Sequence, residues 1–191
     1  MNVEVARFLL DRNAEIDARC VDHNSTPAMW SVMGRENVTR FLIDRGATPD
    51  LFMAAVLDDV PLAEQILEAK PGAIDVRVRL GKSHEHVGYG DKYIWALDFA
   101  QTPAEVARRR EHSAIYTFLL ERSSPFVRLL HAARRGDTEL LTAMLRDEPD
   151  LLPNLSADQT CGARAARARR RPQRARRRKG RDRAVLGRVE R

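Results

Sequence analysis

Residues 38–47 read Val38-Thr39-Arg40-Phe41-Leu42-Ile43-Asp44-Arg45-Gly46-Ala47. The stretch at 5–14 is the same after a shift of 33 residues, except at Ala6/Thr39, Leu10/Ile43 and Asn13/Gly46. Val38, Phe41 and Leu42 are spaced i, i+3 and i+4, which places them on one face of a short helix. Gly and Asn, which follow the two helical segments, are the residues that best adopt the left-handed conformation after a helix. The pattern predicts a repeated helix that ends in a left-handed turn.

Further copies follow along the chain. Residues 115–122 repeat the helix of residues 38–45 after a shift of 77. A second pattern, at 54–71, returns after a shift of 78 at 132–149, and its shared positions are Ala54/Ala132, Ala55/Ala133, Leu62/Leu140, Leu67/Leu145 and Pro71/Pro149. In both copies an acidic turn, Asp58-Asp59 or Gly136-Asp137, separates two apolar segments. Repetition with a period of 20 to 50 residues is typical of stacked helix-turn-helix units.

Two Thr-Pro-Ala triplets, 26–28 and 102–104, open the first helix of a unit. A Thr hydroxyl can cap a helix N-terminus, and Pro fits the first turn, where its missing N–H has no partner to lose. With the paired aliphatic residues of the second helix and Gly46-Ala47, the sequence resembles the ankyrin repeat family over about 150 residues. It departs from that pattern at Met29 and Glu105, where the family has His. The resemblance implies an all-α, ankyrin-type helix-turn-helix solenoid with short hairpin fingers.

The predicted array covers residues 1–155, and residues 156–191 form a basic tail. The units are expected at 2–19 (a half unit), 22–50, 51–75, 94–124 and 126–152. The half unit lacks an opening helix, so we expect a chain that starts within a repeat.

A long finger is expected at 76–93, where the period breaks. Asp75-Val76-Arg77-Val78-Arg79-Leu80 alternates apolar and basic residues as a half-exposed strand does, and 93–97 supplies a second strand or the start of a helix. The finger carries His84-Glu85-His86 and Tyr89-Gly90-Asp91. Two imidazoles on one face of a strand could bind a metal, but no further ligands follow at regular spacing. We favour a solvated finger over a metal site, and contact with a partner through these histidines and Tyr89 is the third interpretation.

No catalytic motif is present, and we expect neither enzymatic activity nor a cofactor or metal. Ser31, Ser113, His112 and His131 fall in predicted repeat helices, where packing and turn roles are commoner than catalytic ones. Trp30 is expected to pack between units, whereas Trp95 is equally compatible with a buried and an exposed position.

Charge divides the 191 residues unevenly. Residues 161–191 contain 13 Arg and one Lys against two acidic residues, a net charge of +12, whereas residues 1–160 carry 19 basic and 25 acidic side chains, a net charge of −6. The tail contains too few apolar residues to offset the entropy of ordering, so we expect it to be disordered in isolation.

Three interpretations of the tail stay open: an arm that binds nucleic acid or an acidic partner, a nuclear localisation address, or translation out of frame in a GC-rich gene. The nucleic-acid candidates are Arg169, Arg170, Arg171, Arg174, Arg176, Arg177, Arg178 and Lys179. No aromatic residue lies within the run, so base stacking is not indicated.

The sequence predicts a cytoplasmic, monomeric, non-catalytic scaffold that binds another protein through its finger tips and the concave faces of its first helices. The expected contact residues are Asp22, His23, Asn24, His84, Glu85, His86, Tyr89 and Asp91. The alternative is a nucleic-acid-associated protein that uses the arginine-rich tail, and a nuclear location is compatible with it.

Overall fold

The computed structural model describes residues 2–78, 92–98 and 100–151, and this part of the chain is all-α, as predicted, with no strand. The α-helices are α1 (Val3–Leu10), α2 (Pro27–Ser31), α3 (Glu36–Asp44), α4 (Leu51–Leu57), α5 (Val60–Ala69), α6 (Lys92–Leu97), α7 (Pro103–Arg109), α8 (Ser113–Arg122), α9 (Pro125–Arg135) and α10 (Thr138–Asp147). Short 3-10 helices, η1 (Pro71–Asp75) and η3 (Pro149–Leu151), follow α5 and α10. The chain divides into two compact units, 1–155 and 156–191, and the second lies outside the described residues.

The predicted Thr-Pro caps are confirmed. The hydroxyl of Thr26 accepts a hydrogen bond from the backbone N–H of Met29 at 3.3 Å, and that of Thr102 accepts one from Glu105 at 3.1 Å. Each cap satisfies one of the backbone donors that a helix N-terminus leaves free. The left-handed turns are also confirmed, because Asn13 has φ 63° and Gly46 has φ 98°.

The pairs α4–α5 and α9–α10 are two copies of one local structure, 78 residues apart. Helices α5 and α10 have the same length, and each is preceded by a left-handed residue, Asp58 (φ 53°) or Gly136 (φ 73°). An aspartate then caps the second helix: Asp59 accepts from Leu62 N at 2.9 Å, and Asp137 accepts from Leu140 N at 3.0 Å. The repeat seen in the sequence is therefore a repeat of the turn, the aspartate cap and the second helix.

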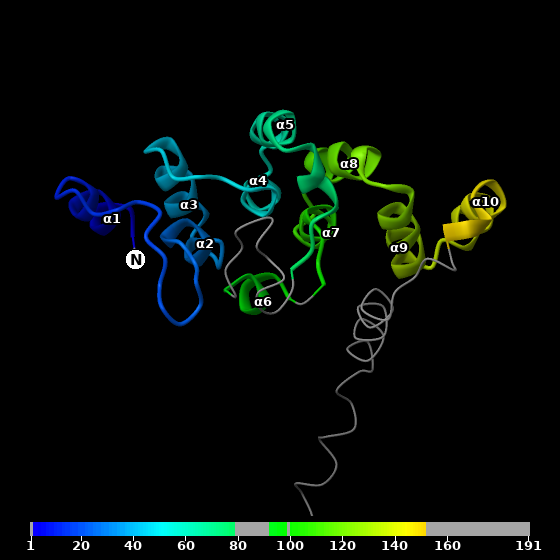
Figure 1. The fold of residues 1–191 in the computed structure, drawn as a ribbon, viewed down its shortest axis with the longest axis horizontal. Helices are drawn as coiled ribbons and strands as arrows, with labels where there is room; N and C mark the ends of the chain where they lie inside the picture. The colour runs from blue at the N-terminus through cyan, green and yellow to red at the C-terminus, as the bar shows by residue number, and fades with distance from the viewer. Residues whose placement is uncertain (1, 79–91, 99, 152–191) are drawn as a thin grey trace, which may run out of the picture. The chain divides into compact units, whose positions relative to one another are not determined.

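Four helix pairs, α2–α3, α4–α5, α7–α8 and α9–α10, follow one another in chain order, with α1 before them (Figure 1). The first helices of neighbouring pairs, α4 and α7, pack on each other, as do the second helices α5 and α8. Buried side chains between the helices form the core, and the largest are Leu51, Phe52, Met53, Tyr93, Ile115 and Leu119.

Polar contacts tie the turns of different pairs together. Arg110, at the end of α7, donates to Glu36 Oε1 at 2.6 Å and to the carbonyl of Val32 at 2.9 Å. The Nδ1 atom of His112 lies 2.9 Å from the carbonyl oxygen of Ala55 in α4. These contacts, which span 57 to 78 residues of sequence, fix the α7–α8 turn against earlier pairs.

The strand expected at 75–80 is wrong where the structure describes it. Asp75 is the last residue of η1, and 76–78 form no strand, although Val78 exchanges two backbone hydrogen bonds with Ala100 and Gln101. Residues 79–91, most of the expected finger, lie outside the described residues.

The end of the predicted finger is helical, because α6 begins at Lys92. This helix packs against α2. Its Tyr93 is 1% exposed, meets the ring of Phe52 edge-on at 5.2 Å and donates to Asp50 Oδ2 at 2.8 Å. Helix α6 is therefore held by contacts with the first helices.

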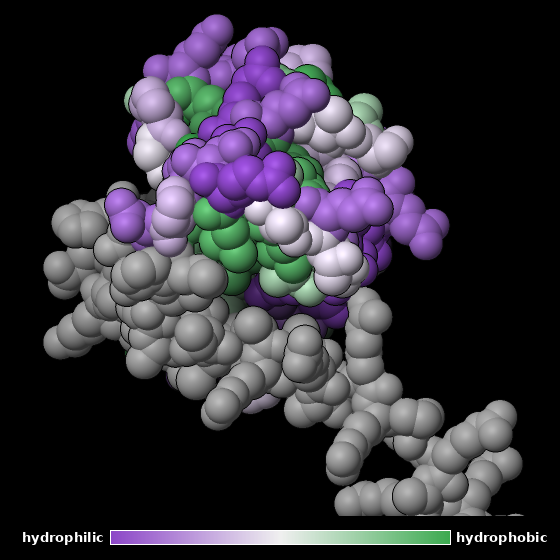
Figure 2. All heavy atoms as spheres, turned by 90° about the vertical axis from the view of Figure 1, so that its right-hand side faces the viewer, coloured by the Kyte–Doolittle hydropathy of each residue, from purple (hydrophilic) through white to green (hydrophobic). Residues whose placement is uncertain are grey.

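Figure 2 views the molecule from the side that lies on the right in Figure 1, where α10 is found. Hydrophobic residues gather there in a small area that hydrophilic residues surround. Leu140 of α10 is 44% exposed, and no residue of α10 is buried, whereas Leu62 and Ala63 of α5 are buried. The α9–α10 pair is thus less completely packed than its copy.

Candidate functional site

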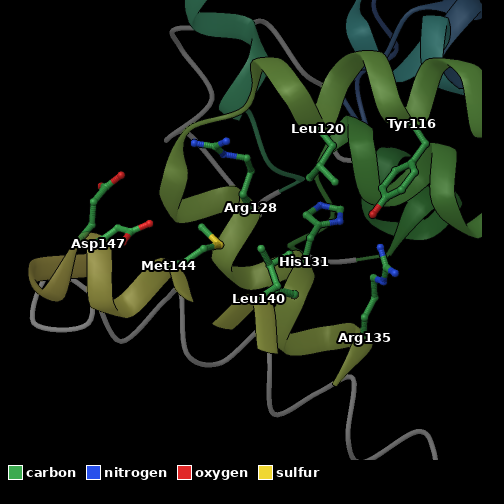
Figure 3. A pocket seen from close by; sticks show the side chains of 10 residues that line it. Tyr116, Leu120, Arg128, His131, Arg135, Leu140, Met144 and Asp147 are labelled. Carbon is green, nitrogen blue, oxygen red and sulfur yellow. The ribbon is translucent and has the colours of Figure 1, made fainter. Parts of the chain in front are cut away.

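A pocket of about 230 Å³ lies between α8, α9 and α10 (Figure 3). Ten residues line it: Tyr116, Leu120, Arg128, His131, Ala132, Arg135, Leu140, Met144, Asp147 and Glu148. The lining residues of α9 recur at i, i+3, i+4 and i+7, and those of α8 and α10 recur mainly at i and i+4. Residues with this spacing share one helix face. The pocket is therefore built from three helix faces that meet.

His131 lines the pocket and also belongs to a buried polar cluster with Thr102 and Glu105, at the start of α7. Its Nε2 atom lies 3.1 Å from the hydroxyl oxygen of Thr102, and its Nδ1 atom lies 3.5 Å from Oε2 of Glu105. The three side chains are almost fully buried. This arrangement fits a neutral imidazole with its proton on Nδ1, directed toward the carboxylate, and with Nε2 accepting from the Thr102 hydroxyl.

Two arginines face the carboxylate of Glu105. Arg108 makes a bidentate contact, with Nε 3.0 Å from Oε2 and Nη2 2.7 Å from Oε1, and Arg134 Nη1 lies 3.9 Å from Oε2. Although burial acts to raise it, hydrogen bonds and charge from Arg108 hold the pKa of Glu105 below its usual value. The carboxylate is thus ionised at neutral pH.

Burial lowers the pKa of His131 to about 4. The nearby carboxylate of Glu105 opposes this shift, and the positive charges of Arg134 and Arg108 add to it. His131 is therefore uncharged at neutral pH, and it adds no charge to the pocket lining.

One buried polar group without a partner in the described part of the chain and two exposed arginines line the pocket. The hydroxyl of Tyr116 is buried and has no hydrogen-bond partner among the described residues. Arg128 and Arg135 of α9 make no ion pair within the same part of the chain. In Figure 3 the Tyr116 hydroxyl and the Arg135 guanidinium lie on the same side of His131, and Asp147 lies at the opposite end. The pocket has a donor-rich end with Tyr116 and Arg135, and a second end with Asp147, on whose side of His131 Arg128 also lies.

The predicted contact residues Asp22, His23 and Asn24 lie in the loop between α1 and α2. The first and third are exposed, and the His23 ring lies 5.4 Å from that of Trp30. Asn24 is left-handed, with φ 45°, and its carbonyl accepts from Arg19 Nη1 at 2.6 Å. The loop is therefore an ordered surface turn.

We expected Trp30 to pack between helix pairs. This prediction is wrong, because 37% of the residue is exposed. Its indole N–H points to Sγ of Cys20, at 3.4 Å, on the loop before α2. A hydrogen bond from the Ser25 backbone and the contact with Trp30 hold the pKa of Cys20 below its usual value. Trp95 of α6 is 69% exposed. Both tryptophans are thus on the surface.

The other predicted site residues lie outside the described residues: His84, Glu85, His86, Tyr89, Asp91, Arg169, Arg170, Arg171, Arg174, Arg176, Arg177, Arg178 and Lys179. Within the described residues, no group of three or more His, Cys, Asp and Glu side chains could hold a metal ion. In the same part of the chain, no helix is long and apolar enough to cross a membrane.

Sequence reasoning did not find the pocket, although the repeat contains a signal for it. A shift of 78 residues places His131 opposite Met53 and Arg135 opposite Leu57. Met53 is a core residue, 1% exposed. A polar residue at a position that is apolar in another copy could have marked this place.

Comparison with known proteins gives no relative. No protein-family model, no curated protein and no solved structure matches the chain.

Proposed function

We propose that the chain is an ankyrin-type repeat scaffold, monomeric and without chemistry of its own, which binds another protein. The observation that carries this proposal is the match between the α4–α5 and α9–α10 pairs, in which a left-handed residue and an aspartate cap precede second helices of equal length. Stacked helix pairs present a preformed surface, which lowers the ordering cost of binding.

The surface loop before α2 is the first candidate contact. Asp22 and Asn24 are exposed there, and Trp30 is exposed beside His23. Aromatic side chains with a polar edge supply much of the binding energy in protein interfaces. The ordered loop gives such contacts a fixed position, which supports a role in partner binding.

The proposal is tested with two matched triple variants of the full chain. The loop variant carries Asp22→Ser, His23→Ser and Asn24→Gly, in which Gly keeps the left-handed backbone. The control variant carries Glu64→Ser, Gln65→Ser and Glu68→Ser on the exposed side of α5.

Proteins retained by the tagged wild-type chain are quantified by mass spectrometry, and the Kd of each purified candidate is then measured. We expect the loop variant to weaken binding at least about tenfold and the control variant less than about twofold. Equal affinity of both variants for every retained protein would overturn the role of the loop. A monodisperse mass near 21.7 kDa in light scattering is expected for the monomer.

A further inference from the structure

The pocket between α8, α9 and α10 occupies a place that its copy fills with core side chains. In the α4–α5 pair, Met53 is 1% exposed and Leu62 is 9% exposed. In the α9–α10 pair, the corresponding residues are His131 and Leu140, and a hollow of about 230 Å³ lies beside them. His131 is 2% exposed and thus as buried as Met53, whereas Leu140 is 44% exposed, so the two copies differ in exposure on the α10 side of the hollow.

We propose that this pocket binds a small monocarboxylate with an apolar body. This inference is independent of the scaffold function, because it concerns a site away from the loop before α2. Leu120, Leu140 and Met144 form the apolar wall, and methionine adapts readily to the shape of a ligand. The volume lies below the roughly 300–1,000 Å³ of pockets that hold drug-sized ligands, so the ligand is small.

The donor-rich end determines the charge of the ligand. Arg135 makes no ion pair among the described residues, and its planar guanidinium matches the geometry of a carboxylate. The buried hydroxyl of Tyr116 lacks a partner in the same part of the chain, and a carboxylate oxygen would accept its proton. Both groups lie on the same side of His131 in Figure 3.

The remaining charges favour one negative charge over two. His131 is neutral, and of the two arginines that line the pocket Figure 3 places Arg135 on the side of the Tyr116 hydroxyl and Arg128 on the side of Asp147. Asp147 and Glu148 at the other end would repel a dianion such as phosphate. An apolar body with a single carboxylate satisfies the donors and keeps its charge away from these acids.

A carboxylate attached to an apolar body can come from a free carboxylic acid or from the C-terminal residue of a polypeptide. We would titrate the full chain with 4-methylpentanoate and with N-acetyl-alanyl-leucine, each paired with its amide, and follow binding by NMR. We expect a Kd on the order of 1 mM for at least one acid and at least about tenfold weaker binding of its amide. The tighter acid identifies the source, and inorganic phosphate serves as the dianionic comparison.

The decisive variant is Arg135→Leu, which introduces the residue of the other copy, Leu57. The matched control is Arg146→Leu, an exposed arginine of α10 outside the pocket lining. We expect Arg135→Leu to weaken binding of the acid at least about tenfold and the control to leave it unchanged. Tyr116→Phe, which removes only the hydroxyl, is the second variant and is expected to weaken binding several-fold even if Arg135→Leu fails to fold.

The proposal is overturned if neither acid binds, if acid and amide bind equally, or if phosphate binds more tightly than both acids. Unchanged affinity in Arg135→Leu or in Tyr116→Phe would also overturn it. Binding of either acid that depends on both side chains supports it.

Discussion

Acidification from pH 7.5 to pH 5 will lower the free energy of unfolding through His131. The pKa of this residue is about 4 in the folded protein, and that of an unperturbed histidine is 6.5. Between these values the unfolded chain binds a proton that the folded chain does not, so stability falls as the pH falls. At 1.36 kcal/mol per pH unit, the interval from 6.5 to 5 amounts to about 2 kcal/mol.

The contribution of His131 is measured by comparison with His131→Met, which carries the residue of the other copy. The charged groups facing the imidazole are Glu105 and Arg108 on α7 and Arg134 on α9. Because the pKa of Glu105 lies below its usual 4.5, this carboxylate titrates mainly below pH 5 and adds little within the interval. Urea unfolding of the full chain at pH 5, 6, 7 and 7.5, followed by circular dichroism at 222 nm, gives both curves.

We expect the wild-type free energy of unfolding, minus that of the variant, to fall by about 2 kcal/mol between pH 7.5 and pH 5. Two further points at pH 8 and 8.5, where His131 is neutral in both the folded and the unfolded chain, should show a constant difference between the curves and provide an internal control. Parallel curves across the whole range would show that the folded protein accommodates a protonated His131, and the account of the buried cluster would be refuted.

Three further predictions follow from other contacts. Burial raises the pKa of Asp50 to about 6, so on acidification the folded chain binds a proton at a higher pH than the unfolded chain does. The free energy of unfolding of the wild type, minus that of Asp50→Asn, should therefore rise by about 1 kcal/mol between pH 7.5 and pH 5 in the same urea assay. Loss of the cap in Asp137→Ala should cost about 1 kcal/mol, and Asp59→Ala should cost more, since Asp59 also pairs with Arg40; equal losses in urea unfolding would contradict this. Deletion of residues 161–191 should remove any salt-dependent retention on DNA in a shift assay, because the rest of the chain has a net charge of −6; retention that survives the deletion would exclude the tail as its source.

Local signals in the sequence were sufficient for the starts of α2 and α7 and for the left-handed turns after α1 and α3. A Thr-Pro cap depends on groups three residues apart, and the left-handed turns at Asn13 and Gly46 depend on a single backbone conformation. The copies at offsets of 77 and 78 then extend each local prediction to a second place in the chain. Helices α5 and α10 follow from this reasoning with their acidic caps.

Tertiary contacts were harder to predict. The residues around Tyr93 are compatible with a strand, and they form α6 because Tyr93 packs on Phe52 and donates to Asp50, more than 40 residues earlier. Trp30 was assigned to the interior from its place on a short helix. Its exposure depends on which elements lie beside α2, and that is not encoded in the local sequence.

The pocket shows why repetition alone could not reveal the candidate site. The repeated turn and aspartate cap fix where α5 and α10 begin, but they leave the side chains between neighbouring pairs free to differ. Within the described residues, α5 packs on α8. The α4–α5 pair has the buried residues Met53 and Leu62 at the positions of His131 and Leu140. The α9–α10 pair keeps the same backbone plan with His131 in place of Met53, and burial of that imidazole costs stability as soon as it is protonated. The hollow and the tyrosine hydroxyl, which has no partner among the described residues, are the observations that point to a ligand, and the comparison of acid with amide tests that explanation.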